Sequence, residues 1–322
     1  MHAGPEPDRH ALDLAERRAT ARASKDFATA DALRDELTAE GWTVVDEPAG
    51  WHLEPAATPE PDVTTEPIRA ADVPSILEEA ATADVSAHWV CEGWPDDIAR
   101  GVASFRAHAG SREVRFVVAD VTEQPEGAFG EDVEVVRLEP GTGWAAARNA
   151  GLRRTAGRIA FVLDGSIEAA GDVFGPLEAA LEDPGVGIAG PFGIVTKDLR
   201  QFDEQPAPGP CDAVEGYFMA LRRHTLAAAG PFDEKFKWYR TADIEYSFRV
   251  KDLGLETRVV DVPVNKHEHR MWFETDPATR AKWSKRNYYR FLDRWRDRWD
   301  LVLDPHPPEP HDHGPDHTHD DH

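Results

Sequence analysis

The middle of the chain alternates short apolar runs with stretches of helical spacing, and this alternation constrains the fold more than any other feature. Apolar runs of strand length stand at 85–90, 114–118, 133–138, 159–163 and 186–189. Strands separated by helices favour an α/β fold, with a mostly parallel sheet covered by helices on both faces. Ligands of such sheets bind beyond the carboxyl ends of the strands. Asp120 and Asp164 both stand at such ends.

Composition divides the 322 residues into four parts. Residues 11–54 combine helical spacing up to Glu40 with a helix stop at Gly41 and a short strand-like run at 42–45. Residues 55–70, rich in Pro, Thr and acid, predict a linker before the α/β domain of residues 71–303. Residues 304–322 lack core-forming side chains and predict a disordered tail; its six histidines favour at most weak metal buffering, or no function.

The charge balance excludes some function classes. Sixty Asp and Glu against 36 Lys and Arg give a net charge of −24, which argues against broad binding to nucleic acid or anionic lipid. Two cysteines favour a reducing compartment. The sequence has neither an apolar run of about 18 residues nor the apolar core of a signal peptide. We therefore predict a cytoplasmic protein without a transmembrane segment.

Two blocks of sequence go beyond a generic α/β domain. One is GTGWAAARNAGLRRTAGRIAFVLDGSIE at 141–168, and the other, at 214–254, contains GPFDEKF and TADIEYSFRV and is followed by VNKHEH. Their order resembles the family 2 glycosyltransferases, over roughly residues 85–296. The resemblance implies the GT-A fold and inverting transfer of a sugar from a nucleoside-diphosphate donor to a hydroxyl acceptor that the sequence does not identify.

The resemblance also implies a donor site. Asp120 would accept hydrogen bonds from base or ribose, although a turn-capping Asp is the plainer alternative. Arg148 and Asn149 would hold ribose and phosphate, because guanidinium suits bidentate phosphate contact. Asp164 stands where the family has the first acid of its metal-binding pair for Mg²⁺ or Mn²⁺, and would bind ribose or a loosely held ion if no metal pair forms. The second acid is replaced by Ser166, whose hydroxyl would contact the ribose or a metal-bound water. Glu168 would compensate, and His267, with His269 nearby, would complete the metal site or remain a surface feature.

The acceptor side follows from the second block. Asp243, expected at the start of a helix, would be the catalytic base that removes the acceptor proton, and the helix start would help keep it ionised. Simple N-capping is the alternative. Acceptor contacts or structural support are expected from Glu215, Gly216, Asp233, Glu245 and Arg249. A helix-face ion pair is the plainer interpretation of Glu245 and Arg249, which are four residues apart.

The segment at 14–54 resembles the C-terminal piece of cysteinyl-tRNA synthetases, through residues such as KDFATADALRDEL at 25–37. The resemblance implies a helical hairpin with a short strand. Nothing of that enzyme's ATP-binding or zinc-binding machinery is present, so aminoacylation is excluded. The mixed charges favour protein docking over RNA contact.

Three functions therefore compete. A glycosyltransferase leads. A non-catalytic scaffold that binds nucleotide or sugar is the alternative, because Ser166 and Ala242 each replace an acid that the family has. In the third, the N-terminal segment makes the protein an accessory of tRNA or synthetase complexes, which the acidic balance disfavours.

Overall fold

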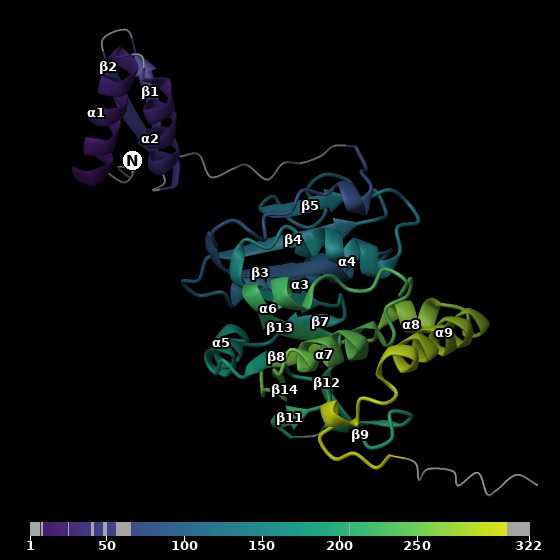
Figure 1. Ribbon diagram of the computed structural model, residues 1–322. Helices are drawn as coiled ribbons and strands as arrows, with labels where there is room; N and C mark the ends of the chain where they lie inside the picture. Colours follow the sequence, from purple (N-terminus) through teal and green to yellow (C-terminus); the bar gives the residue numbers. More distant parts are fainter. Residues whose placement is uncertain are drawn as a thin grey trace, which may run out of the picture. The chain divides into compact units, whose positions relative to one another are not determined.

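The structure is a computed structural model that describes residues 7, 9–24, 26–39, 42–47, 50–55, 66–205 and 207–307. The chain divides into two compact units, Met1–Asp62 and Val63–His322 (Figure 1). Residues 56–65 of the predicted linker and 308–322 of the predicted tail lie outside the described residues.

The N-terminal unit consists of helices α1 (Arg9–Ala23) and α2 (Phe27–Ala39) and the antiparallel strands β1 (Trp42–Glu47) and β2 (Gly50–Pro55). The helical stretch breaks in two at Asp26, whose carboxylate accepts a hydrogen bond from the Thr29 backbone N–H at 3.2 Å and so caps α2. A small apolar core joins helices to strands through Ala11, Leu14, Ala15, Leu33, Leu37 and Val44.

The larger unit is built on an eight-stranded sheet in the order β11-β14-β8-β13-β6-β3-β4-β5. The strands are β3 (Ala83–Cys91), β4 (Val114–Asp120), β5 (Val133–Arg137), β6 (Gly157–Leu163), β8 (Val186–Gly190), β11 (Gly209–Cys211), β13 (Phe218–Arg222) and β14 (Glu256–Val259). Strands β6, β3, β4 and β5 are parallel neighbours, and β8 is parallel to β14. Strand β13 is antiparallel to both β6 and β8. The predicted mostly parallel sheet is confirmed.

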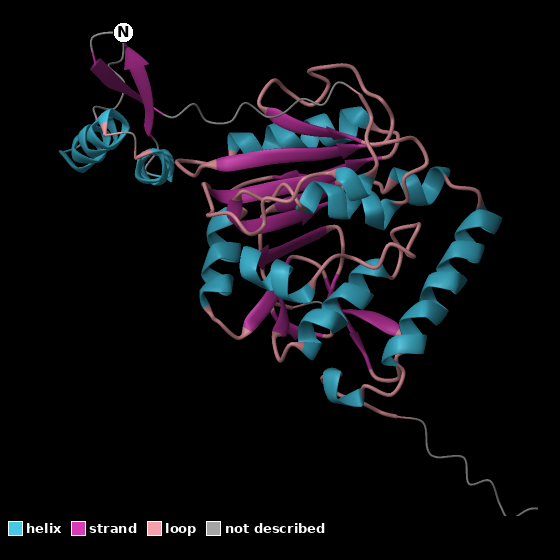
Figure 2. Ribbon diagram, turned by 45° about the horizontal axis from the view of Figure 1, so that its top comes forward, coloured by secondary structure: helices cyan, strands magenta, loops and turns pink. Residues whose placement is uncertain are grey.

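Helices cover both faces of this sheet, as predicted (Figure 2). Helices α3 (Pro95–Ala107) and α5 (Phe174–Glu182) pack on one face, and α4 (Trp144–Leu152), α6 (Arg223–Ala229) and α7 (Ala242–Asp252) pack on the other. Successive side chains of β3 point to opposite faces of the sheet, which explains this arrangement. The ring centroids of Trp89 and Phe105 of α3 lie 5.6 Å apart, edge to face, whereas the neighbouring His88 lies against α4.

Smaller elements complete the unit: β7 (Ile167–Ala169), β9 (Gly193–Thr196), β10 (Phe202–Gln205), β12 (Ala213–Val214), β15 (Val264–Lys266), α8 (Arg270–Glu274), α9 (Pro277–Trp295) and the 3-10 turns Ala70–Asp72 and Trp299–Leu301. The buried Phe291 of α9 packs edge-on against Phe248 of α7 at 5.0 Å. This contact anchors α9 to the sheet's outer helices.

The apolar run at 259–264 does not form one continuous strand. β14 ends at Val259 and β15 begins at Val264, after Pro263, which has no N–H for a ladder bond. β15 then pairs antiparallel with β7, with Asn265 opposite Glu168. This pairing brings the histidines that follow β15 to the end of β6. In the described part of the chain, every helix is too short or too polar to cross a membrane.

Candidate active site

Two adjoining pockets open beyond the carboxyl ends of β3 and β6. We call the first the β3 pocket; Glu92, Trp94 and Asp97 line it, beside the end of β3. We call the second the α7 cleft; it has a volume of about 710 Å³ and is lined by Asp243 and Glu215, among others. Both share a wall made of Trp144, Arg148, Asp164, Tyr239 and His269. The sheet therefore carries one divided cavity where the strand rule places ligands.

Asp164 occupies the centre of the shared wall. Its Oδ1 accepts hydrogen bonds from the backbone N–H of Ser166 at 2.8 Å and from the Ser166 hydroxyl. Its Oδ2 lies 3.1 Å from Nε2 of His269. Burial acts to raise the pKa of Asp164, but the bonds from His269 and Ser166 outweigh it, so the pKa lies below the ordinary value. Asp164 is an anion held in place, with Ser166 as its positioning group.

His269, rather than His267, is the histidine next to Asp164. The Nδ1 of His269 accepts a hydrogen bond from the Trp272 backbone N–H at 3.2 Å, so Nε2 carries the hydrogen that Asp164 accepts. His267 instead lies 2.6 Å from Glu168. His267 and Glu168 pair with each other and line neither pocket, and their predicted part in the metal site stays a prediction.

Arg148 and Asn149 are both buried and bonded to backbone. Arg148 donates to the carbonyls of His88 at 2.8 Å and Leu163 at 2.9 Å, and so ties together the ends of β3 and β6. The Asn149 amide donates to the Phe232 carbonyl and accepts from its N–H, at 2.9 and 2.8 Å. Asn149 lines neither pocket, and its predicted nucleotide contact stays a prediction. Arg148 does line both, and its Nε has no partner among the described residues.

Asp120 is enclosed in its own loop. One carboxylate oxygen accepts from the Thr122 N–H at 2.9 Å and the other from the Gln124 N–H at 2.8 Å. The residue is 1% exposed and lines neither pocket. The turn-capping alternative describes the contacts found, and the predicted contact with base or ribose stays a prediction. Only Asp164 and Asp243 of the three expected carboxylates share a cavity.

Asp243 is the second residue of α7, and the loop before β13 holds its side chain. Its Oδ2 accepts from the Gly216 N–H at 2.8 Å and its Oδ1 from the Ile244 N–H at 2.9 Å. The first bond crosses between separate elements, so Asp243 does more than cap its helix. Any side chain at Gly216 would crowd this carboxylate, because a Cβ there would lie 3.2 Å from the Asp243 Cβ.

Burial raises the pKa of Asp243, although the backbone bonds act to lower it. The expectation that the helix start keeps this carboxylate ionised is therefore outweighed by desolvation. Next to it, the pKa of Glu215 is raised to about 7, first by burial and then by the Asp243 charge. The α7 cleft thus contains two neighbouring carboxylates with raised proton affinity, a common property of acid–base sites.

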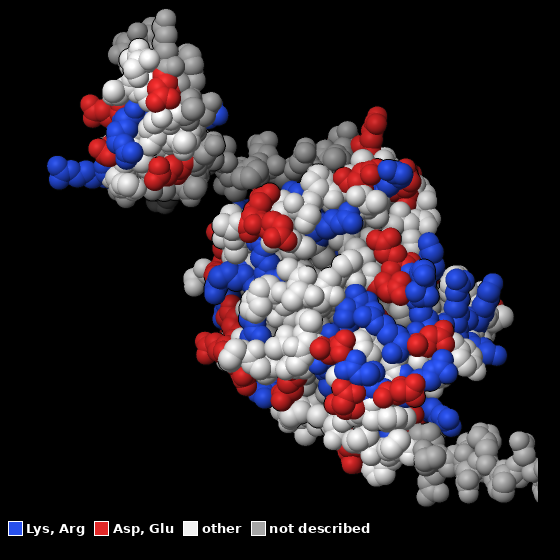
Figure 3. Space-filling model, viewed as in Figure 1, with Lys and Arg blue, Asp and Glu red and all other residues white. Residues whose placement is uncertain are grey.

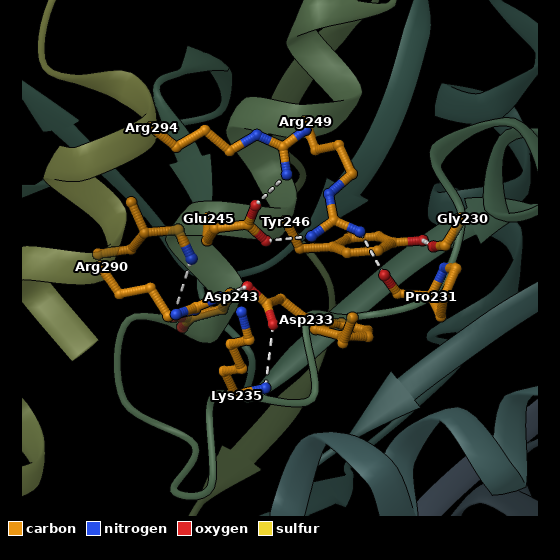
Figure 4. A network of polar contacts seen from close by, with 12 residues as sticks. Gly230, Pro231, Asp233, Lys235, Asp243, Glu245, Tyr246, Arg249, Arg290 and Arg294 are labelled. Atoms are coloured by element: carbon orange, nitrogen blue, oxygen red, sulfur yellow. Dashed lines mark hydrogen bonds and ion pairs between the residues drawn. The ribbon is translucent and has the colours of Figure 1, made fainter. Parts of the chain in front are cut away.

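Asp233, Glu245 and Arg249 form a structural network rather than a ligand site (Figure 4). Glu245, 2% exposed, pairs with Arg249 at 2.5 Å and with Arg294 of α9 at 3.0 Å. Asp233 pairs with Arg290 of α9 at 2.7 Å. The ion pair between Glu245 and Arg249 was the plainer interpretation and is the one found. These pairs join α7 and the loop before it to α9, and none of the three predicted residues lines the cleft.

Glu92 is a site residue that the sequence reasoning missed. Its Oε2 is buried and has no hydrogen-bond partner among the described residues. Burial raises the pKa of Glu92 to about 7, although the Arg148 charge acts to lower it. Its position could have indicated it, since Glu92 directly follows β3 as Asp164 directly follows β6. It was missed because the predicted strand ended with the apolar run at Val90, two residues earlier.

The divalent cation implied by the family resemblance would take Asp164 and His269 as protein ligands only once Nε2 of His269 gives up the hydrogen that Asp164 accepts. Asp164 and His269 are mutually adjacent, and the described residues contain no group of three His, Cys, Asp or Glu arranged to hold a metal. Magnesium sites of phosphate-transferring proteins commonly have one or two carboxylates and take the remaining ligands from substrate phosphates and water. The pair therefore fits a cation that binds together with a diphosphate.

Comparison with known proteins agrees with this geometry. Residues 116–240 match Glycosyl transferase family 2, and residues 5–52 match the Cysteinyl-tRNA ligase anticodon binding domain. A crystal structure of GalNAc-T7 with UDP, GalNAc and Mn²⁺ superposes with a TM-score of 0.55 at 16% identity, covering 68% of this chain and 50% of that one. That likeness shows the fold. Residues 116–240 therefore resemble Glycosyl transferase family 2, and the larger unit has a GT-A-like fold.

The N-terminal match is higher in identity and shorter. The cysteine–tRNA ligase of Opitutus terrae is 58% identical over 43 residues, which are 13% of this chain and 9% of that enzyme. The ligase of Cutibacterium acnes is 62% identical over 39 residues, 12% of this chain and 8% of that enzyme. The chain spans less than a tenth of the length of these relatives. Both predicted resemblances are confirmed.

Proposed function

We propose that this protein is an inverting glycosyltransferase that moves a sugar from a nucleoside-diphosphate sugar to a hydroxyl acceptor. One observation carries the proposal: Asp243, held by the Gly216 N–H, faces the same cleft as Asp164. An acid that positions the donor and a second carboxylate free to take a proton are the two groups such a transfer needs. The family match over residues 116–240 supports the same class.

Asp243 is the proposed base. As the acceptor oxygen bonds to the anomeric carbon, its proton passes to the Asp243 carboxylate, and the bond from that carbon to the diphosphate oxygen breaks. The nucleoside diphosphate leaves with the bonding electrons, and the configuration at the anomeric carbon inverts. Burial suits Asp243 to this role, because a raised pKa increases a carboxylate's affinity for the proton.

The proposed donor site is the shared wall together with the β3 pocket, which has a volume of about 40 Å³ by itself, so that the donor would extend from this pocket into the α7 cleft. Glu92 would accept hydrogen bonds from the nucleoside, since its buried Oε2 otherwise lacks a partner. Asp164 and His269 would hold Mg²⁺ or Mn²⁺ against the diphosphate. Such a cation, when bound, neutralises charge on the leaving group.

Binding without turnover is the second candidate function. It is favoured by Ser166, which holds Asp164 where the family has another acid, and by the lack of a third ligand in the described residues. Calorimetry with UDP-, GDP- and dTDP-sugars, with and without Mn²⁺, combined with a donor-hydrolysis assay, separates the two. Nucleotide binding with turnover that Asp243→Asn abolishes supports the enzyme. Binding without turnover supports the scaffold.

We propose that the N-terminal unit docks a protein. Residues 1–54 hold twelve Asp and Glu against six Lys and Arg, a poor balance for a phosphate backbone. A gel-shift titration with tRNA tests this directly. No shift at physiological salt is expected, and a shift retained there would favour the RNA contact that the matched domain's name implies.

A further inference from the structure

The outer wall of the α7 cleft carries cations that form no ion pair with any described residue. Residues 270–298 contain nine Lys or Arg and four Asp or Glu, in a chain whose net charge is −24. Figure 3 shows these basic side chains gathered over α8 and α9. Several of them are used in ion pairs, such as Arg290 with Asp233 and Arg294 with Glu245. The cations that line the cleft are different ones.

Arg200 and Lys285 both line the cleft, are exposed, and form no ion pair with any described residue. Arg200 lies between β9 and β10, and Lys285 lies on α9. The two segments are joined where the Tyr288 hydroxyl donates to the Leu199 carbonyl at 3.1 Å. Asp198, the acid nearest to Arg200 in sequence, already accepts from the backbone N–H groups of Arg200 and Gln201. We call Arg200 and Lys285 the rim cations.

The carboxylates that line the cleft do not account for the rim cations. Three carboxylates lie close together in the cleft, because the charges of Asp243 and Glu204 both act to raise the pKa of Glu215. Two cations lie near them: the charges of Lys266 and, less strongly, Arg240 act to lower the pKa of Glu215, and Arg240 also acts to lower that of Asp243. Arg240 is also stacked over Trp272 at 4.7 Å. The acids of the cleft therefore have their own cations.

A third donor stands beside the rim cations. Ser284 precedes Lys285 on α9, lines the cleft, and its buried hydroxyl has no hydrogen-bond partner among the described residues. A guanidinium fork, an ammonium and a hydroxyl together match the three terminal oxygens of a phosphate monoester better than the two of a carboxylate. Buried polar groups without a partner in the protein call for a ligand that supplies one.

We propose that Arg200, Lys285 and Ser284 bind a phosphate group of the acceptor, so that a hydroxyl of the same molecule reaches Asp243. The delivery of a hydroxyl to Asp243 rests on the proposed function, whereas phosphate binding at the rim does not. Phosphate binding at the rim can be measured whether or not sugar is transferred. The acceptor class is therefore a hydroxyl compound that carries phosphate, either a soluble one or a phospholipid headgroup.

The test titrates glycerol 3-phosphate into the full-length protein whose donor pocket has been saturated with nucleoside diphosphate, so that phosphate is measured outside that pocket. Arg200→Glu and Lys285→Glu are each expected to weaken glycerol 3-phosphate binding about tenfold or more. Lys282→Glu is the matched control, since Lys282 is exposed on the same helix and does not line the cleft. Nucleoside diphosphate affinity and melting temperature should be unchanged in all three variants.

Vesicles separate the two sources of phosphate. Sedimentation with phosphatidylcholine vesicles that contain phosphatidylinositol 4-phosphate, whose headgroup has a phosphate monoester and free hydroxyls, identifies a lipid headgroup if it is lost in Arg200→Glu and Lys285→Glu but kept in Lys282→Glu. Binding of glycerol 3-phosphate alone, with the same variant pattern, identifies a soluble acceptor. The proposal is overturned if neither probe binds, or if Lys282→Glu weakens binding as much as the rim variants do. A protein that binds phosphate at the rim but no nucleotide would refute the proposed function and leave this site standing.

Discussion

The β3 pocket and the α7 cleft adjoin each other, yet they hold their charged groups by different means. On the wall next to the β3 pocket, which the α7 cleft shares, Arg148 and Asp164 are fixed by hydrogen bonds to strand residues and to the turn after β6. In the α7 cleft, the corresponding groups come from loops and from α9, and Arg200 and Lys285 are exposed. Groups anchored to a buried sheet are set by the fold, whereas those on loops and appended helices can change without disturbing it. The difference suggests a general donor site next to an acceptor site particular to this chain.

The largest expected effect is on catalysis at the α7 cleft. Asp243→Asn removes the proposed proton acceptor and should lower kcat by about 10²- to 10⁴-fold, with donor affinity within about twofold of the parent because the β3 pocket is intact. Steady-state transfer kinetics and calorimetry measure the two quantities. Asp203→Asn, on the exposed strand β10, is the control. An unchanged kcat in Asp243→Asn would contradict the assignment of the catalytic base to the α7 cleft and of donor binding to the β3 pocket.

The next effect is on stability at the β3 pocket. Arg148→Met leaves the carbonyls of His88 and Leu163 without their donor in a buried site, which should lower the free energy of unfolding by about 2–5 kcal/mol. Arg148→Lys keeps the charge and should recover part of the loss. Urea unfolding gives the values. Were Arg148→Met to weaken nucleotide binding at undiminished stability, Arg148 would be a ligand-binding residue instead.

A smaller effect separates the two histidines. Removal of divalent cations with EDTA should lower turnover, and Mn²⁺ should restore it. His269→Ala should raise the Mn²⁺ concentration needed for half-maximal activity by about 10- to 100-fold, because His269 adjoins Asp164. His267→Ala should leave that concentration unchanged, because His267 pairs with Glu168. Equal responses of the two variants would contradict this assignment.

The smallest effect is the pH dependence of stability. Because the pKa of Glu215 is raised to about 7 in the folded protein, from 4.5, folding favours its protonated form. Its stabilising contribution is complete below the unfolded pKa and is lost as pH rises through the folded pKa. Relative to the wild type, Glu215→Gln should therefore gain about 1–3 kcal/mol between pH 4.5 and about 8. Denaturation curves at both pH values measure this, and parallel pH profiles would show that Glu215 titrates normally.

The pH dependence of activity should follow Asp243, the other carboxylate whose pKa is raised. Protonation of Asp243 removes the proposed base, so kcat/KM should fall as pH falls, with a midpoint above the 3.8 of an ordinary Asp. The residual activity of Asp243→Asn should not show this fall of kcat/KM at low pH. If kcat/KM of Asp243→Asn still falls at low pH, the titrating group is another one, such as Glu215.

Much of the fold was readable from the sequence, because the burial pattern of a strand or helix is written in its own residues. The five apolar runs became β3, β4, β5, β6 and β8, and the carboxyl-end rule placed Asp164 in the cavity. The order of the family motifs placed Asp243 opposite it. The antiparallel strand β13 between β6 and β8 was not foreseen, since pairing depends on distant segments.

The tertiary structure alone decided which polar groups are free to meet a ligand. Asp120 and Asn149 have residue types suited to nucleotide binding, but their own loops and Phe232 take up their hydrogen bonds. His269 rather than His267 reaches Asp164 because β15 pairs with β7. Arg200 and Lys285 are 85 positions apart in the sequence and come together in one cleft. A sequence fixes the chemistry that each side chain carries, whereas its partners depend on contacts made across the whole chain.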